Sequence, residues 1–381
     1  MKRDWRYKVC VLGVILIFCL PMAGMILFNK SEVLSGENRK SASFPRFDLH
    51  GQSNPYASID QYIQRVNSYY SDHLGFRSEL LSLYRFCKVS LFGGILYPEK
   101  AVRGTDNWYF LGDSFNNVIK ESKGIIYFSE TQLDTIEKNL LTIDKECRER
   151  GIKLYVAIAP NKLSVYGKYL PILQFDHPTK PEQLISRMKR DRIPVIDLKK
   201  DFSHYSDRRL FHRNDTHWNS FGAFIGYRTL MDVIAEDFPQ VRPLSLNDYE
   251  LDTIVSSDGD LTPMLSLTIP EERVVMKPLF ESRTDKKIIK IPLPDYYTGN
   301  PDDFAIRYTN PARPLKALVY RDSFFTVMAP FIKETFGESV MIWHPFGRSL
   351  MESEKPDLII YEIVERNIDD LVKIRQFNIH L

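Results

Sequence analysis

The sharpest run of hydrophobic positions lies at the N-terminus. Val9 to Phe28 form an uncharged apolar run of about 20 residues, enough to cross a bilayer as a helix. Four basic residues precede it: Lys2, Arg3, Arg6 and Lys8. Positive flanks stay in the cytoplasm, so we expect a single-pass helix in the cell (inner) membrane with a cytoplasmic N-terminus. A cleaved signal peptide is the alternative; the length of the run and the lack of a clean small-x-small cleavage pattern favour a retained anchor.

Beyond this run, the pattern divides the chain into a linker and a long domain. Residues 29–56 are rich in Ser, Asn and charge, which is typical of a linker. From Ala57 to Phe92, apolar residues recur near helical spacing on both sides of Gly75, which predicts two amphipathic helices. The expected organisation is residues 1–28 as basic tip and anchor, 29–56 as linker, and 57–381 as one periplasmic or extracellular domain.

Strand-like and helical patterns alternate through the rest of the chain. Ser129 with Gln132 forms a capping-box pattern, which predicts a helix to about Arg150. Residues 240–312 are less regular and indicate loops and short strands. Further helices are expected at 220–238 and 324–336, and strands at 153–159, 194–198, 315–320, 340–343 and 357–364. This order predicts an α/β fold with a mainly parallel sheet, helices on both faces, and active residues just beyond the carboxyl ends of strands.

Composition narrows the partners. The net charge is +2 and no basic stripe stands out, so nucleic acid is not an expected partner. Aromatic residues make up 13% of the chain; most belong in a core, but a surplus of Tyr also suits a sugar-binding groove. Two of the four cysteines, Cys87 and Cys147, lie outside the N-terminal run. They form either a disulfide or two buried free thiols.

Two short segments carry the residue types of nucleophilic catalysis. Ser323 follows the strand expected at 315–320 and opens a helix, whose first N–H groups suit a developing oxyanion. A serine hydroxyl needs a base, and His217 is a suitable one. Asp215, two residues before His217, is close enough in a turn to orient the imidazole. The pattern therefore predicts a Ser323–His217–Asp215 catalytic triad.

Each of these residues also has an ordinary structural interpretation. Ser323 could cap the helix that it opens, His217 could lie in the core, and Asp215 could be a turn residue. Asp215 and His217 with the nearby His212 could instead bind a metal ion, but no further acidic or His cluster has an obvious ligand pattern. We therefore expect neither a metal site nor a cofactor.

Taken together, these motifs resemble those of the SGNH-hydrolase-like polysaccharide O-acetyltransferases, the alginate O-acetyltransferase (AlgJ/AlgX-like) group. The resemblance covers about residues 57–366, and the pairing of its last two motifs is its most specific feature. The matching stretches are 106–113 (DNWYFLGD), 159–162 (APNK) with Val165-Tyr166, 215–218 (DTHW) and 322–324 (DSF).

The resemblance implies a flavodoxin-like α/β/α domain in which Ser323 is the nucleophile, His217 the base and Asp215 the orienting carboxylate. Arg321 replaces the glycine that often precedes Asp-Ser in the family, which leaves the details of the oxyanion hole open. Asn161 loosely matches an oxyanion asparagine of related hydrolases, although a plain loop residue is the alternative. Two further candidates for contact with substrate lie in the matching stretches: Trp218 and Tyr166.

The expected activity is transfer of acetyl groups to hydroxyls of a secreted or cell-surface polysaccharide through an acetyl-serine intermediate. The resemblance implies a multi-spanning membrane-bound O-acyltransferase as the partner that supplies acetyl across the membrane. A carbohydrate acetylesterase with the same triad is one alternative. A non-catalytic polysaccharide-binding component of an export machine is the other.

Overall fold

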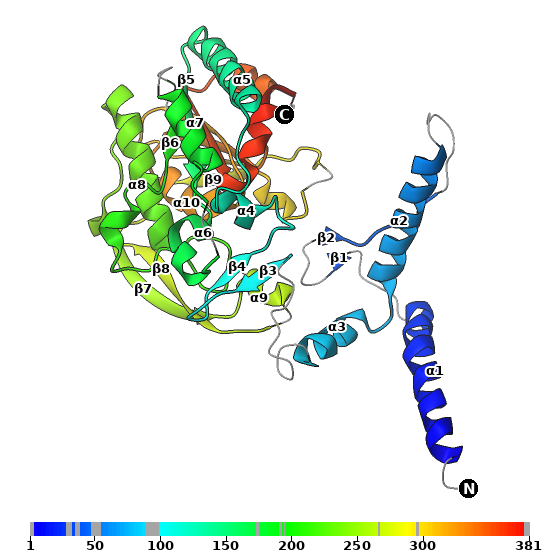
Figure 1. Ribbon diagram of the computed structural model, residues 1–381. Coiled ribbons are helices and arrows are strands. Elements are labelled where there is room, and N and C mark those ends of the chain that lie inside the picture. The colour runs from blue at the N-terminus through cyan, green and yellow to red at the C-terminus, as the bar shows by residue number, and fades with distance from the viewer. Residues whose placement is uncertain are drawn as a thin grey trace. The chain divides into compact units, whose positions relative to one another are not determined.

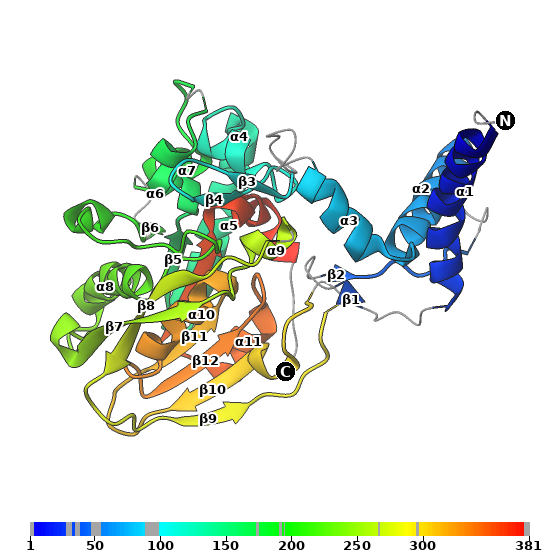
Figure 2. The same cartoon turned by 90° about the horizontal axis from the view of Figure 1, so that it is seen from below.

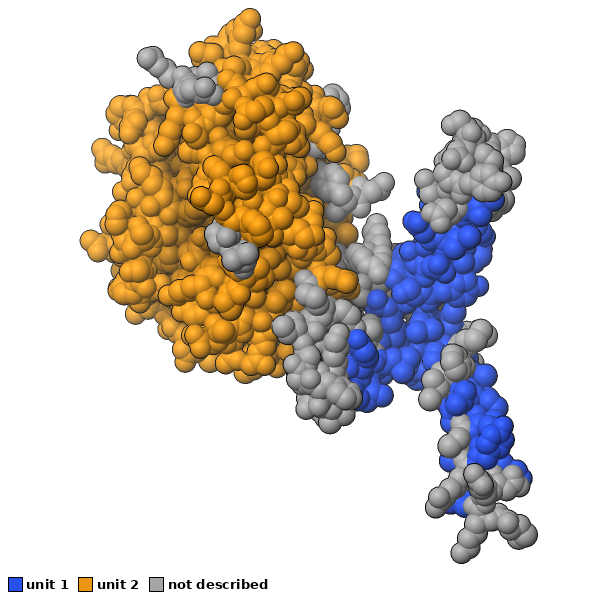
Figure 3. All heavy atoms as spheres, in the orientation of Figure 1, with its two compact units in different colours: residues 1–96 blue, residues 97–381 orange. Residues whose placement is uncertain are grey.

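A computed structural model describes residues 4–27, 33–34, 39–46, 55–87, 99–172, 175–189, 193, 195–265, 267–294 and 297–376. The chain forms two compact units, Met1–Leu96 and Tyr97–Leu381 (Figure 3). The expected domain began at residue 57, whereas the larger unit begins at Tyr97. The helices predicted between residues 57 and 92 thus belong to the smaller unit.

The smaller unit contains three helices and one short β-ladder among its described residues. Its elements are α1 (Asp4–Leu27), β1 (Val33–Leu34) paired with β2 (Arg39–Lys40), α2 (Pro55–His73) and α3 (Arg77–Phe86). Within the described part of the chain, no helix has the length and apolar character needed to cross a membrane. This finding corrects the expected single-pass transmembrane helix: α1 forms at the apolar run, but it starts in the charged segment at Asp4 and contains Pro21.

The larger unit is built on a seven-stranded sheet in the order β6-β5-β13-β11-β12-β10-β9 (Figure 2). The first five strands run parallel, and β10 and β9 add an antiparallel edge. Their bounds are β5 Lys153–Ala159, β6 Val195–Asp197, β9 Asp285–Ile288, β10 Ala305–Thr309, β11 Lys316–Tyr320, β12 Glu338–Ile342 and β13 Leu358–Val364. The mainly parallel sheet is therefore confirmed, and its five parallel strands coincide with the predicted ones.

Helices cover both faces of this sheet, because both faces are apolar. In β5, Tyr155 and Ala157 pack into one hydrophobic cluster, while Val156 and Ile158 pack into the other, as the two-residue period of a strand requires. The first cluster is closed by α8 (Ser220–Asp237) and α10 (Ser323–Ile332), and the second by α5 (Glu130–Arg148), α7 (Lys180–Met188) and α11 (Arg348–Glu354) (Figure 1). The result is a three-layer α/β/α domain.

Local signals account for several helix ends. The Ser129–Gln132 capping box is present at the start of α5, as predicted. Asn219 caps α8 through a hydrogen bond from Gly222 N–H, and Asp322 caps α10 through one from Phe324 N–H.

Smaller elements cover the carboxyl edge and the flanks. They are β3 (Ala101–Arg103) paired with β4 (Tyr109–Leu111), α4 (Val118–Ser122), α6 (Lys162–Tyr166), and α9 (Leu261–Met264). The region predicted as loops and short strands also holds a long antiparallel pair, β7 (Tyr249–Ser256) with β8 (Glu271–Pro278). Short 3-10 turns are η2 (Gly167–Tyr169), η3 (Phe202–Tyr205), η4 (Leu246–Asp248), η5 (Pro301–Asp303), η6 (Glu365–Val372) and η7 (Ile374–Gln376).

Candidate active site

The loop carrying Asp215 and His217 is held firmly at both sides. A β-bridge joins Phe211 to Trp218, and the fully buried Trp218 indole donates a hydrogen bond from Nε1 to the Phe324 carbonyl at 2.9 Å. Gly222 lets the chain before the loop pack against α8, since a Cβ there would lie 2.2 Å from the Leu210 carbonyl oxygen. The loop is therefore tied directly to α10.

Ser323 is positioned by the turn between β11 and α10. Asp322, just before it, accepts hydrogen bonds from Phe324 N–H at 2.9 Å and from Val364 N–H, at the end of β13, at 2.8 Å. The turn is thereby fastened across two neighbouring strands. Because Ser323 is the first residue of α10, its backbone N–H has no acceptor within the helix and is available to a ligand.

These two segments bring the three predicted residues into one hydrogen-bonded chain. Ser323 Oγ lies 2.9 Å from His217 Nε2, and His217 Nδ1 lies 2.8 Å from Asp215 Oδ1. The same Asp215 oxygen accepts from the His217 backbone N–H at 2.9 Å, and Oδ2 lies 3.1 Å from the Arg273 guanidinium. The Asp215 side chain is 11% exposed and the His217 side chain is 23% exposed. Solvent therefore reaches the three hydrogen-bonded side chains mainly at His217 and Ser323.

The electrostatics of this chain favour an anionic Asp215 and a basic imidazole. Burial raises the pKa of Asp215, but the hydrogen bonds and charge of His217 outweigh it, so the net pKa falls well below its usual range. Burial lowers the pKa of His217, but hydrogen bonding to Asp215 and the charges of Asp215 and Asp260 raise it above its ordinary value. His217 is thus a better proton acceptor than an isolated histidine.

Asp260 is a second carboxylate beside the imidazole. Its Oδ2 lies 3.8 Å from His217 Nδ1, and its Oδ1 accepts from Thr216 N–H at 2.7 Å. Ligand atoms of Asp215, His217 and Asp260 lie within 4.8 Å of one another, a spacing that could hold a metal ion. However, a metal on Nδ1 would compete with the Nδ1–H bond to Asp215, and Arg273 already occupies the other Asp215 oxygen. The donors fit a hydrogen-bonded relay better than a metal centre.

Lys162 holds the loop that carries Asp215 and His217 through hydrogen bonds to its backbone. This role was not identified from the sequence. Lys162 is buried, and its Nζ donates to the carbonyl oxygens of His212, Arg213 and Asp215 at 3.0, 3.1 and 2.6 Å. Burial lowers its pKa to about 7. Its position in the 159–162 motif was the available signal. Asp260 and Arg273 come from the irregular region, where no sequence pattern pointed to them.

Asn161 is oriented by a hydrogen bond from Arg366. Its Oδ1 accepts from the Arg366 guanidinium at 3.3 Å, and its backbone N–H donates to Glu365 at 2.9 Å. Both residues line a small cavity with Thr216, and the Arg366 guanidinium lies 5.1 Å from the centre of the Phe324 ring. Arg366 thus links Asn161 to Phe324, the residue after Ser323.

The remaining three candidates, Trp218, Tyr166 and Arg321, make contacts within the protein. Trp218 is fully buried in the core. The Tyr166 hydroxyl accepts from Leu210 N–H at 2.9 Å, and its ring stacks on Trp108 at 4.3 Å. Arg321 extends under Trp343, 4.8 Å from the ring centre, and donates to Thr326 Oγ1 at 3.0 Å. Through hydrogen bonds, Trp218 and Arg321 contact α10, and Tyr166 contacts the chain just before the loop that carries Asp215 and His217.

The cysteines outside the N-terminal run are unpaired. Both Cys87 and Cys147 are free thiols, and the buried Cys147 lies 3.6 Å from the sulfur of Met351. Of the two interpretations left open by the sequence, a disulfide or two buried free thiols, the buried free thiol describes Cys147.

Comparison with known proteins finds one family model and one curated relative that are similar to parts of this chain. Residues 101–287 match the family model described as the SGNH hydrolase-like domain of acetyltransferase AlgX, which includes Asp215 and His217 but ends before Ser323. A curated relative, the probable alginate O-acetylase AlgJ of Pseudomonas fluorescens, is 26% identical over 142 residues. That alignment covers 36% of this chain and 34% of the relative, so the chain matches about a third of its length.

Solved structures agree on the fold. Bacillus cereus PatB1, solved with a sulfonyl adduct, is 15% identical with a TM-score of 0.54, covering 72% of this chain and 96% of that one. A DHHW family protein from Eubacterium siraeum is 12% identical with a TM-score of 0.51, covering 75% of this chain and 98% of that one. At these identities the likeness concerns the fold alone. The family model matches residues 101–287, just under half of this chain, so the conclusion is that this part of the chain is similar to the SGNH hydrolase-like domain of acetyltransferase AlgX.

Proposed function

We propose that this chain is an O-acetyltransferase that moves acetyl groups onto hydroxyls of a secreted or cell-surface polysaccharide through an acetyl-serine intermediate. The observation that carries the proposal is the hydrogen-bonded chain from Ser323 Oγ through His217 to Asp215 at the carboxyl edge of the sheet. The similarity of residues 101–287 to the acetyltransferase AlgX model, and of part of the chain to a probable alginate O-acetylase, supports acetyl as the group transferred and a polysaccharide as the acceptor.

The first half-reaction loads the serine. Ser323 Oγ attacks the carbonyl carbon of the acetyl ester while His217 Nε2 accepts its proton, and Asp215 stabilises the resulting imidazolium. The negative charge of the tetrahedral intermediate develops near the start of α10, where the Ser323 N–H points outward from the helix end. Collapse breaks the bond to the donor alcohol, which takes the proton from His217. The products are acetyl-Ser323 and the free donor alcohol.

The second half-reaction repeats these steps with a sugar hydroxyl. His217 removes the hydroxyl proton, the sugar oxygen bonds to the acetyl carbon, and the Ser323–acetyl bond breaks. The proton then returns from His217 to Ser323 Oγ, which restores the free enzyme. Water in place of the sugar would give hydrolysis, so transfer depends on a bound acceptor that reaches the intermediate before water does.

We further propose that the reaction takes place outside the cytoplasm, in the periplasm or at the cell surface, and that a multi-spanning membrane-bound O-acyltransferase supplies the acetyl group. Both points rest on the resemblance to the polysaccharide O-acetyltransferases.

The test is direct detection of the intermediate. The full-length chain is incubated with p-nitrophenyl acetate, and its intact mass is measured after quenching. We expect one acetyl group on Ser323, and none in the Ser323→Ala and His217→Ala variants. Acetyl retained in the Ser323→Ala protein would refute the nucleophile. Added oligosaccharides then separate transfer, which acetylates the sugar, from esterase activity, which releases acetate alone.

A further inference from the structure

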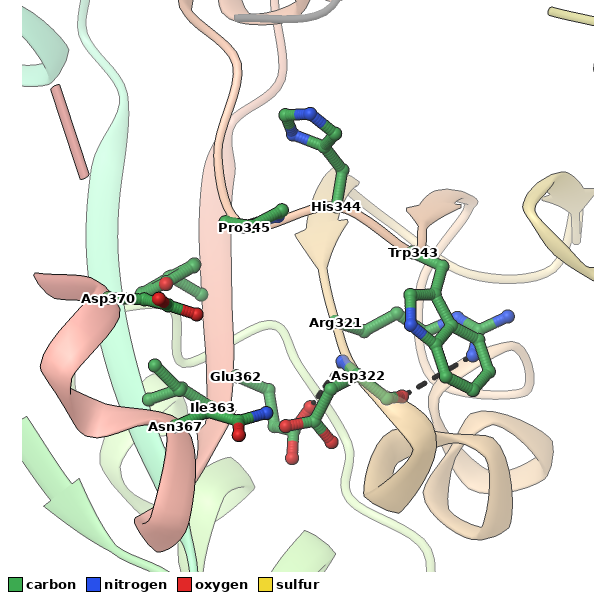
Figure 4. Close-up of a pocket in the computed structure, with 10 residues that line it drawn as sticks. Arg321, Asp322, Trp343, His344, Pro345, Glu362, Ile363, Asn367 and Asp370 are labelled. Carbon is green, nitrogen blue, oxygen red and sulfur yellow. Dashed lines mark hydrogen bonds between the residues drawn. The ribbon is translucent and has the colours of Figure 1, made fainter. Parts of the chain in front are cut away.

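A cavity of about 270 Å³ opens directly beside the catalytic turn, at the carboxyl ends of β11, β12 and β13 (Figure 4). Asp322, the residue before Ser323, forms part of its wall, together with Trp343 after β12 and Glu362 in β13. Asn367 and Asp370 of η6 close another side. Pockets for drug-sized ligands start near about 300 Å³. This cavity therefore suits a group about the size of one sugar ring.

Two polar atoms of its wall lack a hydrogen-bond partner among the described residues. Glu362 is 2% exposed; one of its oxygens accepts from Asp322 N–H at 3.0 Å, while Oε1 is buried and has no partner among the described residues. The Arg321 Nε, also in the wall, is likewise buried and unpaired within the described chain. Such atoms are costly unless something satisfies them. A hydroxyl both donates and accepts, so it matches both atoms chemically, although the protein covers each of them in the absence of a ligand.

The aromatic part of the wall is Trp343. It is half-buried, and Figure 4 shows it on the opposite side of the Asp322–Glu362 pair from Asp370. An indole beside carboxyl groups offers apolar surface for the C–H groups of a sugar and acceptors for its hydroxyls. The wall therefore has the two kinds of contact that recognise a sugar ring.

The charges of the wall select against an acidic sugar. Three carboxyl groups, those of Asp322, Glu362 and Asp370, face a single guanidinium, that of Arg321. Arg321 is already engaged, since it donates to Thr326 at 3.0 Å and lies under Trp343. Burial raises the pKa of Glu362 well above its usual value, which favours the neutral carboxyl over the carboxylate. Burial lowers the pKa of His344 to about 4, so this residue adds no positive charge near neutral pH.

We propose that this cavity is the acceptor subsite and receives one uncharged, hydroxyl-bearing sugar ring of the polysaccharide while disfavouring a uronate. The inference rests on the proposed function and specifies its substrate class. It sets this chain apart from what the name of its relative, an alginate O-acetylase, suggests, since a uronate carboxylate would meet Asp370 and Asp322 without a free cation in the wall.

Sugar binding to the full-length Ser323→Ala protein tests the proposal without requiring turnover. Neutral tetrasaccharides (cellotetraose, maltotetraose and chitotetraose) are compared with tetragalacturonate by calorimetry or ligand-observed NMR at millimolar concentration. We expect at least one neutral sugar to bind at least about tenfold more tightly than the uronate, because like charges in an interface are strongly unfavourable. Equal or tighter binding of tetragalacturonate, or no saturable binding of any neutral sugar, would overturn the assignment.

Wall variants locate the binding. Trp343→Ala should weaken the neutral sugar roughly tenfold, while Trp343→Phe, which keeps an aromatic ring, should retain most of the affinity. Asp370→Asn should strengthen uronate binding about threefold, the effect of removing one partly exposed charge. Asp285→Asn is the matched control, because Asp285 is exposed and lies away from the cavity. In the sheet, Asp285 lies opposite Thr309, and Thr309 lies opposite Glu338. Glu338 begins β12, whereas Trp343 follows the other end of that strand.

Effects of the wall variants no larger than that of the control would place the sugar elsewhere. If p-nitrophenyl acetate does not acylate Ser323 in the unmodified protein, the proposed function is contradicted, but the sugar site is not. Acylation without a preference for neutral sugars would remove only the acceptor assignment. The two failures are therefore distinguishable.

Discussion

Replacing Asp215 with Asn removes one charge from the catalytic chain while keeping the side-chain shape. Asp215 Oδ1 accepts two N–H groups of His217, and Oδ2 accepts from Arg273. The Asn amide has only one oxygen. If that oxygen faces His217, the amide NH₂ faces the Arg273 guanidinium, donor against donor. If it is flipped, the NH₂ faces Nδ1 and favours the tautomer with the proton on Nε2, which cannot accept from Ser323.

The expected loss follows from these contacts. Removing the orienting carboxylate of such a triad lowers the rate by about 10³–10⁴-fold, equivalent to roughly 4–5.5 kcal/mol. The pH dependence should also move. Neutral His217 is the active form, and its pKa is raised, so the acylation rate of the unmodified protein rises with pH through a midpoint above the ordinary histidine value of about 6.5. Without the Asp215 charge, this midpoint should fall.

Asp260→Asn is the matched comparison, because it makes the same chemical change beside the same imidazole. Asp260 Oδ2 lies 3.8 Å from Nδ1, against 2.8 Å for Asp215 Oδ1, and its side chain is 24% exposed against 11%. We therefore expect a loss of less than about tenfold, since a more exposed charge that makes no hydrogen bond to the imidazole is weakly coupled to it. Acylation by p-nitrophenyl acetate is followed by stopped flow across the pH range. A larger loss in Asp260→Asn than in Asp215→Asn would refute the assigned order of the chain.

Three further predictions concern the residues around the Ser323–His217–Asp215 hydrogen bonds. Lys162→Met removes the side-chain donor from the buried carbonyl oxygens of His212 and Asp215, so the free energy of unfolding should fall by about 3 kcal/mol in urea titrations. Lys200→Met, at an exposed position, should change it little. Asn161→Ala should lower the acylation rate about 10²-fold if its amide helps to hold the oxyanion, and a change below about threefold would exclude that role. Dialysis against EDTA should leave acylation unchanged, because the atoms around His217 are engaged in hydrogen bonds; a loss that zinc restores would contradict the metal-free relay.

Much of the fold followed from local patterns. The alternation of strand-like runs and amphipathic segments predicted the five parallel strands, and the Ser129 capping box predicted the start of α5. The residue types at Ser323, His217 and Asp215 also predicted a hydrogen-bonded Ser-His-Asp arrangement, because each stood in a local context that suits its expected role. The N-terminal helix formed where its apolar run lies, but its expected transmembrane character is not supported by the described residues.

Local patterns could not supply the order of the strands or what meets at their ends. Ser323 and His217 are 106 residues apart, and their 2.9 Å contact exists because β11 lies inside the sheet and the Trp218 indole ties the histidine loop to α10. Lys162 donates hydrogen bonds to backbone carbonyl oxygens. Every residue has such an oxygen, so the sequence could not indicate which residues Lys162 contacts. The cavity beside Ser323 is likewise assembled from three strand ends and η6. The sequence by itself determined which groups can react; only the packing of distant segments decided their distances, their burial and hence their charge states.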